Sequence, residues 1–378
     1  MKQRLLDFLQ CPECAGDLDL DAFLRKDEHP GLALFKDSQP PTAPPPLQPG
    51  EEIWEGKLTC RGCAREFPVI AGVPRLLPAA LLAASLREFH GEFIARYRDR
   101  FRDLPDPAGA ERKRVETMNA FGYQWTTFLQ NFDDYRGLFY SFVRPYLAPE
   151  DFKGKRVLDV GCGSGRPASV VLNDGAEVVG ADISQAVESA YALSAYYPNF
   201  HAVQADASAL PFKPCFDFVY SVAVIQHIPR PGDVFKSVAR VLTPGQRFVI
   251  WVYGRREWWY KPIDALRLAT TRLPYPIVRV LSWICAIASE ILLLTPYRIL
   301  AAIPATRRLA ERMPGRIYAR LRFRENVLGW FDRLIAPVTQ YFSRADVERF
   351  YAEAGFDQVE LYARPDASAS WVGQARKR

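Results

Sequence analysis

The 378-residue sequence lacks a secretory signal and is poor in histidine. Its opening residues, MKQRLLDFLQ, contain no apolar run of the signal-peptide kind, so we expect a cytoplasmic protein. Of its four histidines, His29, His90 and His201 have no neighbours that suggest a chemical role, which leaves His227 to be weighed. The rest of the composition, 49% hydrophobic and 24% charged, is ordinary and predicts one large core with appended modules.

Seven cysteines include two CxxC pairs, Cys11 with Cys14 and Cys60 with Cys63. In a reducing compartment such pairs are more often metal ligands than disulfides, and four thiolates suit one structural zinc ion in tetrahedral geometry. Four ordinary free cysteines are the alternative. The 45 residues between the two pairs contain QPPTAPPPLQP at 39–49, whose prolines lack backbone donors and predict an extended loop.

A glycine-rich turn follows a predicted buried strand at 156–160, in the stretch VLDVGCGSG. A dinucleotide-binding turn would place its third glycine where this chain has Arg166, so the match to that motif is poor. Asp159 would also repel a pyrophosphate, whereas it would attract a cation. S-adenosylmethionine carries a sulfonium and an ammonium group beside a nucleoside, so we expect this methyl donor as the ligand.

Acidic residues also follow the next two predicted strands. Asp182 comes after the strand 177–180, where it can accept hydrogen bonds from both ribose hydroxyls; a surface turn aspartate is the alternative. Asp206 comes after the strand 202–204 and can accept the exocyclic amine of adenine, because ligands of open α/β sheets lie at the carboxyl ends of the strands. The predicted cofactor-binding residues are Asp159, Gly161, Gly163, Gly165, Asp182, Ile183, Asp206 and Ala207.

A further strand, predicted at 216–221, delivers His227 to the same edge. Histidine has an unperturbed pKa of about 6.5, so a neutral imidazole here can take a proton from an acceptor hydroxyl or amine, and His227 is the catalytic candidate. A residue that only shapes the pocket is the alternative, because methyl transfer from a sulfonium can proceed by positioning alone. Upstream, Tyr123 and Trp125 of FGYQWTTF are substrate candidates, with core packing as the alternative.

Taken together, VLDVGCGSG, VVGADIS, VQADASALPF and FDFVYSVAVIQHIPRP, followed by VARVLTPGQRFVIWVYG, resemble class I S-adenosylmethionine-dependent methyltransferases, especially the branch with quinone-biosynthesis enzymes. The resemblance spans about 151–254 and resumes near 343. It implies a Rossmann-like α/β sheet of seven strands, closed by FDQVELYA and SWVGQA after a helix from Ser343 to Gly355. It also implies that Asp159 and the three glycines hold the amino acid portion of the donor, Asp182 the ribose and Asp206 the adenine.

The first 78 residues resemble a second family. CPEC, the second CxxC pair and FPVIAGVPRLL are similar to the small zinc ribbons that occur alone as methyltransferase activators and fused ahead of bacterial methyltransferases. We therefore expect a zinc ribbon at 1–78 with a Pro-rich insertion, a helical connector at 79–150, and a methyltransferase core at 151–254 and 341–378. A helical cap at 255–340 is inserted after the fifth strand of the core.

The cap is both apolar and basic. Residues 255–340 contain 15 Lys and Arg against 6 Asp and Glu, and include IVRVLSWICAIASEILLLTPYRILAAIP, which is interrupted by Pro296. Its few polar residues form a narrow helical stripe: Arg279, Ser282, Ser289 and Glu290, with Ala286. This pattern favours either a soluble cap or peripheral contact with anionic lipid through 277–324, at the inner face of the membrane; a true membrane span is the third alternative.

These features predict methyl transfer to a hydrophobic small molecule or lipid-linked intermediate, on oxygen or carbon. An rRNA guanine methyltransferase is one alternative, since such enzymes also join a zinc ribbon to this core and arginines can bind phosphates. Nucleic acid is the less favoured partner, because no Asn-Pro-Pro-Tyr motif follows the fourth strand and Pro214-Cys215 precedes that strand. A catalytically silent methyltransferase-fold partner protein is the other alternative.

Overall fold

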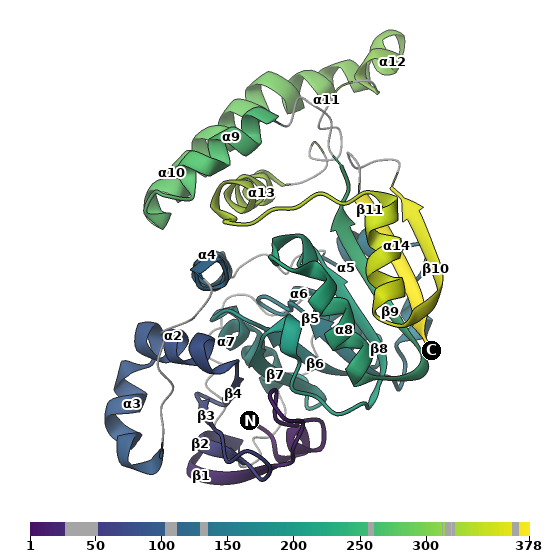
Figure 1. The fold of residues 1–378 in the computed structure, drawn as a ribbon. Coiled ribbons are helices and arrows are strands. Elements are labelled where there is room, and N and C mark those ends of the chain that lie inside the picture. Colours follow the sequence, from purple (N-terminus) through teal and green to yellow (C-terminus); the bar gives the residue numbers. More distant parts are fainter. Residues whose placement is uncertain are drawn as a thin grey trace. The chain divides into compact units, whose positions relative to one another are not determined.

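The computed structural model describes residues 1–26, 52–102, 112–128, 135–255, 261–311, 313, 319, 322–364 and 370–378 (Figure 1). It divides into two compact units. The first unit comprises Met1–Arg255, Val338–Ala363 and Ser370–Arg378, and the second comprises Arg256–Pro337 with Arg364–Ala369. The predicted Pro-rich loop at 39–49 lies outside the described residues.

The first unit is built on a sheet with the strand order β1-β2-β3-β4-β7-β6-β5-β8-β9-β11-β10. Its methyltransferase part has five mutually parallel strands, and β11 runs antiparallel between β9 and β10. These strands are β5 (Arg156–Val160), β6 (Glu177–Asp182), β7 (Phe200–Ala205), β8 (Phe216–Val222), β9 (Leu242–Tyr253), β10 (Phe356–Ala363) and β11 (Ser370–Lys377). The predicted seven-stranded α/β fold is confirmed.

The parallel strands are buried because helices cover both faces of the sheet (Figure 1). Val157, Leu158 and Val160 of β5, for example, are all fully buried. The covering helices are α5 (Tyr135–Val143), α6 (Arg166–Asn173), α7 (Ala186–Tyr191), α8 (Pro231–Val241) and α14 (Arg344–Glu353). The last begins where the sequence predicts, because the Ser343 hydroxyl accepts from the Asp346 amide and the Asp346 carboxylate accepts from the Ser343 amide.

The zinc ribbon does not stand apart from this sheet. Its strands are β1 (Leu18–Lys26), β2 (Glu52–Cys60), β3 (Glu66–Ile70) and β4 (Val73–Leu76), and each pairs antiparallel with the next. Strand β4 then pairs in parallel with β7, Arg75 opposite Gln204 and Leu76 opposite Ala205. The sheet therefore has eleven strands rather than seven, because the ribbon covers the edge that β7 would otherwise expose.

The connector between ribbon and core is helical where the structure describes it. It contains α2 (Ala79–Phe89), α3 (Gly91–Tyr97), α4 (Arg112–Thr127) and α5. Short 3₁₀ turns complete the first unit at Gln3–Asp7, Arg98–Arg100, Pro149–Asp151, Ala192–Ala195, Ala207–Ala209 and Ile225–His227.

The second unit is helical. Its helices are α9 (Lys261–Thr270), α10 (Tyr275–Ser289), α11 (Thr295–Ala302), α12 (Arg307–Ala310) and α13 (Phe323–Ile335), with a 3₁₀ turn at Pro304–Thr306. Pro296 does not end the apolar helix, because a π-helical turn, η8 (Glu290–Leu294), carries α10 into α11 and Tyr275–Ala302 forms one helical stretch of 28 residues. A wider turn just before a proline relieves the clash of its ring with the preceding turn.

Candidate cofactor site at the carboxyl edge of the sheet

Three glycines turn the chain sharply between β5 and α6. Gly161, Gly163 and Gly165 all have positive φ angles, of 80°, 53° and 86°. A Cβ atom on Gly161 would lie 2.2 Å from the Val224 side chain, and one on Gly165 would lie 2.5 Å from Leu193. Both the conformation and the packing therefore require glycine, and the turn is held as a fixed cradle at the carboxyl edge.

Asp159 lies immediately before this turn and is buried. In the sheet it stands opposite Gly180 of β6 and Tyr220 of β8. Burial raises the pKa of Asp159 to about 8, and the neighbouring Asp182 carboxylate adds to the increase. Its Oδ2 atom has no hydrogen-bond partner among the described residues. The Tyr220 phenol lowers the pKa of Asp159 by a hydrogen bond, which only partly offsets burial. A buried carboxyl with one free oxygen beside the glycine turn suits a cationic ligand, so these residues fit the methyl donor.

Asp182 ends β6 and is already bonded to the glycine turn. Its Oδ2 accepts from the Gly163 amide at 2.9 Å, and its Oδ1 accepts from the amide and the hydroxyl of Ser184 at 2.8 and 2.7 Å. A carboxylate has about four acceptor sites, so some capacity remains for a ribose hydroxyl. Burial raises the pKa of Asp182. Ile183, which follows it, accepts a hydrogen bond on its carbonyl from the Gln204 side chain at 3.0 Å.

Asp206 follows β7 and has two partners. Its Oδ1 accepts from the Ser208 amide at 2.8 Å, which caps the turn beginning at Ala207. The same carboxylate forms an ion pair with Arg114 of α4. An adenine amine would therefore share this carboxylate with a guanidinium. No local pattern identifies Arg114 as a site residue, because it stands 92 positions before its partner.

Helix α4 of the connector contacts several of these elements. The Phe121 ring lies 5.0 Å from the His227 ring, between centroids, and a Cβ atom on Gly122 would lie 3.5 Å from the Gln185 amide nitrogen. Farther along, the Trp125 indole lies against the glycine turn, since a Cβ atom on Gly163 would come within 3.4 Å of it.

The Arg166 guanidinium sits over both Trp125 and Tyr135, 4.9 and 4.8 Å from the ring centroids. Trp125 thus adjoins the donor-binding turn, and Tyr123 of the same helix is partly buried. Their predicted role toward a substrate stays a prediction.

His227 is buried after β8. Its Nδ1 lies 2.8 Å from the Val338 carbonyl oxygen, and its ring contacts Tyr253 edge-on at 5.8 Å between centroids. A neutral imidazole that donates from Nδ1 carries its lone pair on Nε2, the nitrogen that a general base would use. The preceding Gln226 is fully buried, and neither polar atom of its amide has a partner within the described chain. The sequence analysis missed Gln226, since an isolated amide carries no pattern.

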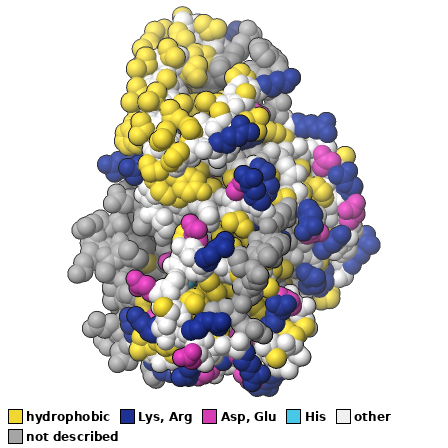
Figure 2. All heavy atoms as spheres, turned by 60° about the vertical axis from the view of Figure 1, so that its left-hand side comes forward, with side chains coloured by type: hydrophobic (Ala, Val, Ile, Leu, Met, Phe, Trp, Pro, Cys, Tyr) yellow, Lys and Arg dark blue, Asp and Glu magenta, His cyan; other side chains and the backbone are white. Residues whose placement is uncertain are grey.

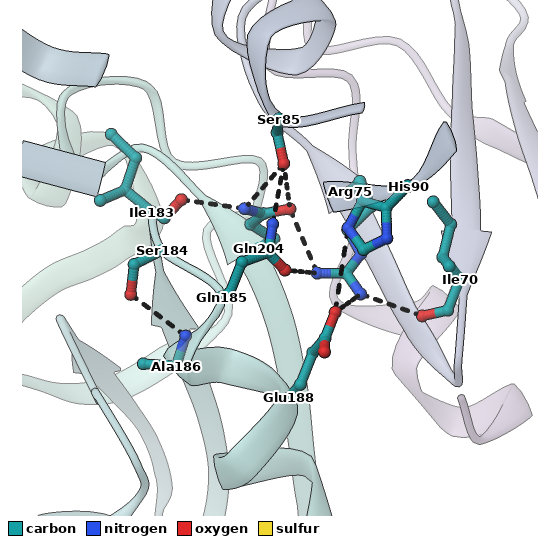
Figure 3. Close-up of polar contacts among 10 residues, drawn as sticks. All are labelled: Ile70, Arg75, Ser85, His90, Ile183, Ser184, Gln185, Ala186, Glu188 and Gln204. Carbon is teal, nitrogen blue, oxygen red and sulfur yellow. Dashed lines mark hydrogen bonds and ion pairs between the residues drawn. The ribbon is translucent and has the colours of Figure 1, made fainter. Parts of the chain in front are cut away.

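Arg75 of β4 connects the ribbon to the loops that hold Ile183 and Gln185 (Figure 3). It is fully buried, and its guanidinium donates to the side chains of Gln185 and Gln204, both at 3.2 Å, and to Glu188 at 2.6 Å. Since Gln204 also donates to the Ile183 carbonyl, one cation fixes the strand ends that carry Asp182 and Asp206.

The four predicted zinc ligands come together in the ribbon. The Sγ atoms of Cys11, Cys14, Cys60 and Cys63 all lie within 4.8 Å of one another, and the Cys14–Cys60 and Cys11–Cys63 pairs are 3.4 and 3.7 Å apart. Zinc–sulfur bonds of about 2.3 Å in a tetrahedron place sulfur atoms about 3.8 Å apart. The cluster therefore fits one zinc ion held by four thiolates.

A seven-stranded sheet of this order, with a glycine turn after its first strand, is the fold of class I S-adenosylmethionine-dependent methyltransferases. Two family models match the chain: the methyltransferase domain over residues 158–250 and the Trm112p-like protein over residues 2–72. The chain thus carries a methyltransferase domain of this class behind a Trm112-like zinc ribbon, as the sequence predicts.

The relatives match only part of the chain. The ubiquinone biosynthesis O-methyltransferase of Paracidovorax citrulli is 38% identical over 104 residues, which cover 26% of this chain and 43% of that protein. The tRNA U34 carboxymethyltransferase of Pseudoalteromonas atlantica is 29% identical over 160 residues, 36% of this chain and 49% of that protein. The chain therefore spans less than half the length of these relatives.

Among solved structures, a complex that contains the Haloferax volcanii Trm112 methyltransferase activator aligns with a TM-score of 0.40 and 13% identity. The alignment covers 69% of this chain and 96% of that chain.

Proposed function

We propose that the protein transfers a methyl group from S-adenosylmethionine to a hydrophobic small molecule or lipid-linked intermediate, on oxygen or carbon. The observation that carries the donor assignment is the buried Asp159 carboxyl beside the glycine turn, whose Oδ2 atom has no hydrogen-bond partner among the described residues. The match of residues 158–250 to the methyltransferase domain supports it.

Different residues of the chain would bind different parts of the donor. Asp159 and the turn from Gly161 to Gly165 would bind the charged amino acid portion of the donor, Asp182 the ribose and Asp206 the adenine. S-adenosylmethionine, when bound, supplies an electrophilic methyl group. The imidazole of His227 would take the proton of an acceptor hydroxyl on Nε2, while Nδ1 stays bonded to the backbone.

The acceptor assignment rests on what the chain inserts after β9. The insertion begins and ends at the carboxyl end of this strand, where Gly254 bridges to Phe342 and the Phe342 amide donates to the Tyr253 carbonyl at 2.9 Å. Its helices expose a large apolar surface. An apolar module tethered at the edge that carries the donor ligands favours a lipophilic acceptor, and the quinone-pathway name of one relative points the same way.

A tRNA acceptor is the second candidate. One relative is named as a tRNA-modifying enzyme, and eight arginines lie between Arg298 and Arg324. Arginine clusters bind phosphates and make binding steeply salt-dependent. This candidate predicts that RNA, and not a lipid extract, takes up the methyl group.

Donor binding is tested by calorimetric titration. The zinc-loaded protein should bind S-adenosylmethionine, and Asp182→Ala should weaken binding by ~100-fold, since a charged hydrogen-bond acceptor is lost. Asp174→Ala is the matched control, because that aspartate bonds Arg136 and Tyr140 away from the turn. Tight binding of NADH without a response to the donor would reverse the assignment.

Catalysis is tested on whichever extract fraction takes up labelled methyl groups. If the acceptor is a hydroxyl, His227→Ala should lower kcat by ~100-fold or more and leave donor affinity unchanged. His201→Ala, a buried histidine beside Glu177, is the control. An unchanged rate in His227→Ala leaves this residue as pocket lining.

A further inference from the structure

The apolar helix of the second unit carries most of its large apolar side chains on its exposed side. On the exposed side of α10 and the π-helical turn, eight large apolar side chains have exposed fractions of 38–71%: Ile277, Val280, Trp283, Ile284, Ile287, Ile291, Leu292 and Leu293. The buried side instead holds Val278, Ser282 and Ala286. Amphipathic helices of water-soluble proteins have the opposite arrangement, with large apolar residues inward. The outer face is therefore made for an apolar medium.

The inner face is fixed within the second unit. The Trp330 indole of α13 donates to the Ser289 hydroxyl at 3.1 Å. Val327 and Phe331 of α13 are fully buried. Within the predicted polar stripe, Ser282 and Ala286 are therefore buried and Ser289 bonds α13, whereas Arg279 is exposed. The large apolar side chains remain on the exposed side.

The exposed apolar residues gather in one region of the chain. Of seventeen large hydrophobic residues that are exposed in the described chain, fourteen lie between Leu266 and Leu309 of the second unit. Figure 2 shows these elements as a continuous hydrophobic surface. Patches of this kind mark surfaces that meet a membrane or another apolar partner.

Positive charge flanks the apolar face. Glu290 is the only acidic residue in Tyr275–Ala302, and it is ion-paired with Arg298. Exposed arginines lie before, within and after the apolar helical stretch, and four of them form no ion pair within the described chain: Arg272, Arg279, Arg307 and Arg308. An apolar face bordered by unpaired cations fits a surface of anionic lipid headgroups rather than a neutral one.

We infer that this face docks on an anionic lipid bilayer and lies in its interface. The 28 residues of the helical stretch, about 42 Å long, have a mean hydropathy of 2.1 over their most apolar window and are long enough to span. A span would, however, strip α13 from the inner face, expose Phe331 and leave Ser289 and Glu290 in hydrocarbon. A helix that lies in the interface keeps α13 packed on its inner face and keeps Ser289 and Glu290 out of the hydrocarbon. The inference holds whatever the acceptor is.

The test is flotation of the full-length, zinc-loaded protein with vesicles of phosphatidylcholine, alone or mixed with phosphatidylglycerol. We expect at least tenfold stronger binding to the anionic vesicles, reversed by high salt. Ile284→Asp with Ile287→Asp should weaken that binding at least tenfold without lowering Tm, because these side chains contact solvent. Tyr362→Asp, at an exposed aromatic residue of β10, is the control and should bind normally.

Charge reversal separates the electrostatic contribution to vesicle binding from the apolar one. Arg272→Glu with Arg279→Glu should weaken binding to the anionic vesicles and leave the weak binding to neutral vesicles unchanged. The inference is overturned if neither vesicle binds the protein. It is also overturned if the aspartate variants only change the oligomeric state, or if bound protein resists both salt and alkaline carbonate, which indicates a span.

Discussion

Binding of the methyl donor should release a proton from Asp159. Burial raises the pKa of this carboxyl to about 8, so in the donor-free protein at pH 7 it is mainly neutral. A bound cation favours the carboxylate and lowers that pKa. Between the lowered pKa and about 8, binding therefore releases close to one proton, and donor affinity should rise by up to ~tenfold per pH unit.

The neighbouring Cys162 thiol and Tyr220 phenol cannot supply this proton. Burial raises the pKa of the Cys162 thiol and of the Tyr220 phenol well above their usual values, so both stay neutral near pH 7. The α-amino group of the donor titrates near about 7.8 and has the opposite linkage, so the window is about pH 6–7.

The assay is calorimetric titration of the donor in buffers with different ionisation enthalpies. Asp159→Asn keeps the shape of the side chain but has no proton to release, so its linkage should be near zero and its donor affinity lower. Tyr220→Phe retains the carboxyl but removes the phenol hydrogen bond that lowers the pKa of Asp159, so it should still release a proton, over a window shifted to higher pH. Wild-type binding without proton release, or equal release from Asp159→Asn, refutes this account of Asp159.

Three further predictions concern the supports of the site. Cys60→Ser should lower Tm by ~5 °C or more and abolish stoichiometric zinc in elemental analysis, with Cys215→Ser as control; a wild-type protein that is metal-free when freshly reduced contradicts the zinc centre. Arg75→Met should lower the free energy of unfolding by ~3 kcal/mol in denaturant titration, because it leaves Gln185, Gln204 and Glu188 without their shared cation. The same variant should also weaken donor binding. A loss of stability with unchanged donor affinity would show that Arg75 stabilises the fold but does not support the donor site. Trp125→Ala should weaken the donor about tenfold in the same titration, whereas an unchanged Kd removes it from the site.

Local patterns in the sequence predicted most of the methyltransferase fold. Strand β5 has the predicted bounds, and α14 begins at the Ser343 capping box and ends before Gly355. Glycine, capping residues and apolar runs act over a few positions, so one sequence is enough to read them. The acidic residues after β5, β6 and β7 could be placed at one edge for the same reason, because parallel strands share their carboxyl ends.

Contacts between segments that are distant in the sequence could not be predicted from such local patterns. The pairing of β4 with β7 and the ion pair of Arg114 with Asp206 join residues roughly a hundred or more positions apart. Nothing local distinguishes Arg75 from a surface arginine, although it is fully buried. In the second unit the sequence showed a polar stripe on an apolar helix but could not say which side faces α13. In the structure Ser282 and Ala286 of that stripe are buried and Ser289 bonds α13, whereas Arg279 is exposed.

The most direct test of the proposed function is the fate of a labelled methyl group. The zinc-loaded protein is incubated with radiolabelled S-adenosylmethionine and with lipid, small-metabolite and RNA extracts separately, with Asp182→Ala as the control for background. The proposed function predicts label in an organic-soluble, small molecule or lipid product that Asp182→Ala does not form. Label recovered in RNA, with none in the lipid or small-metabolite extracts, would contradict it.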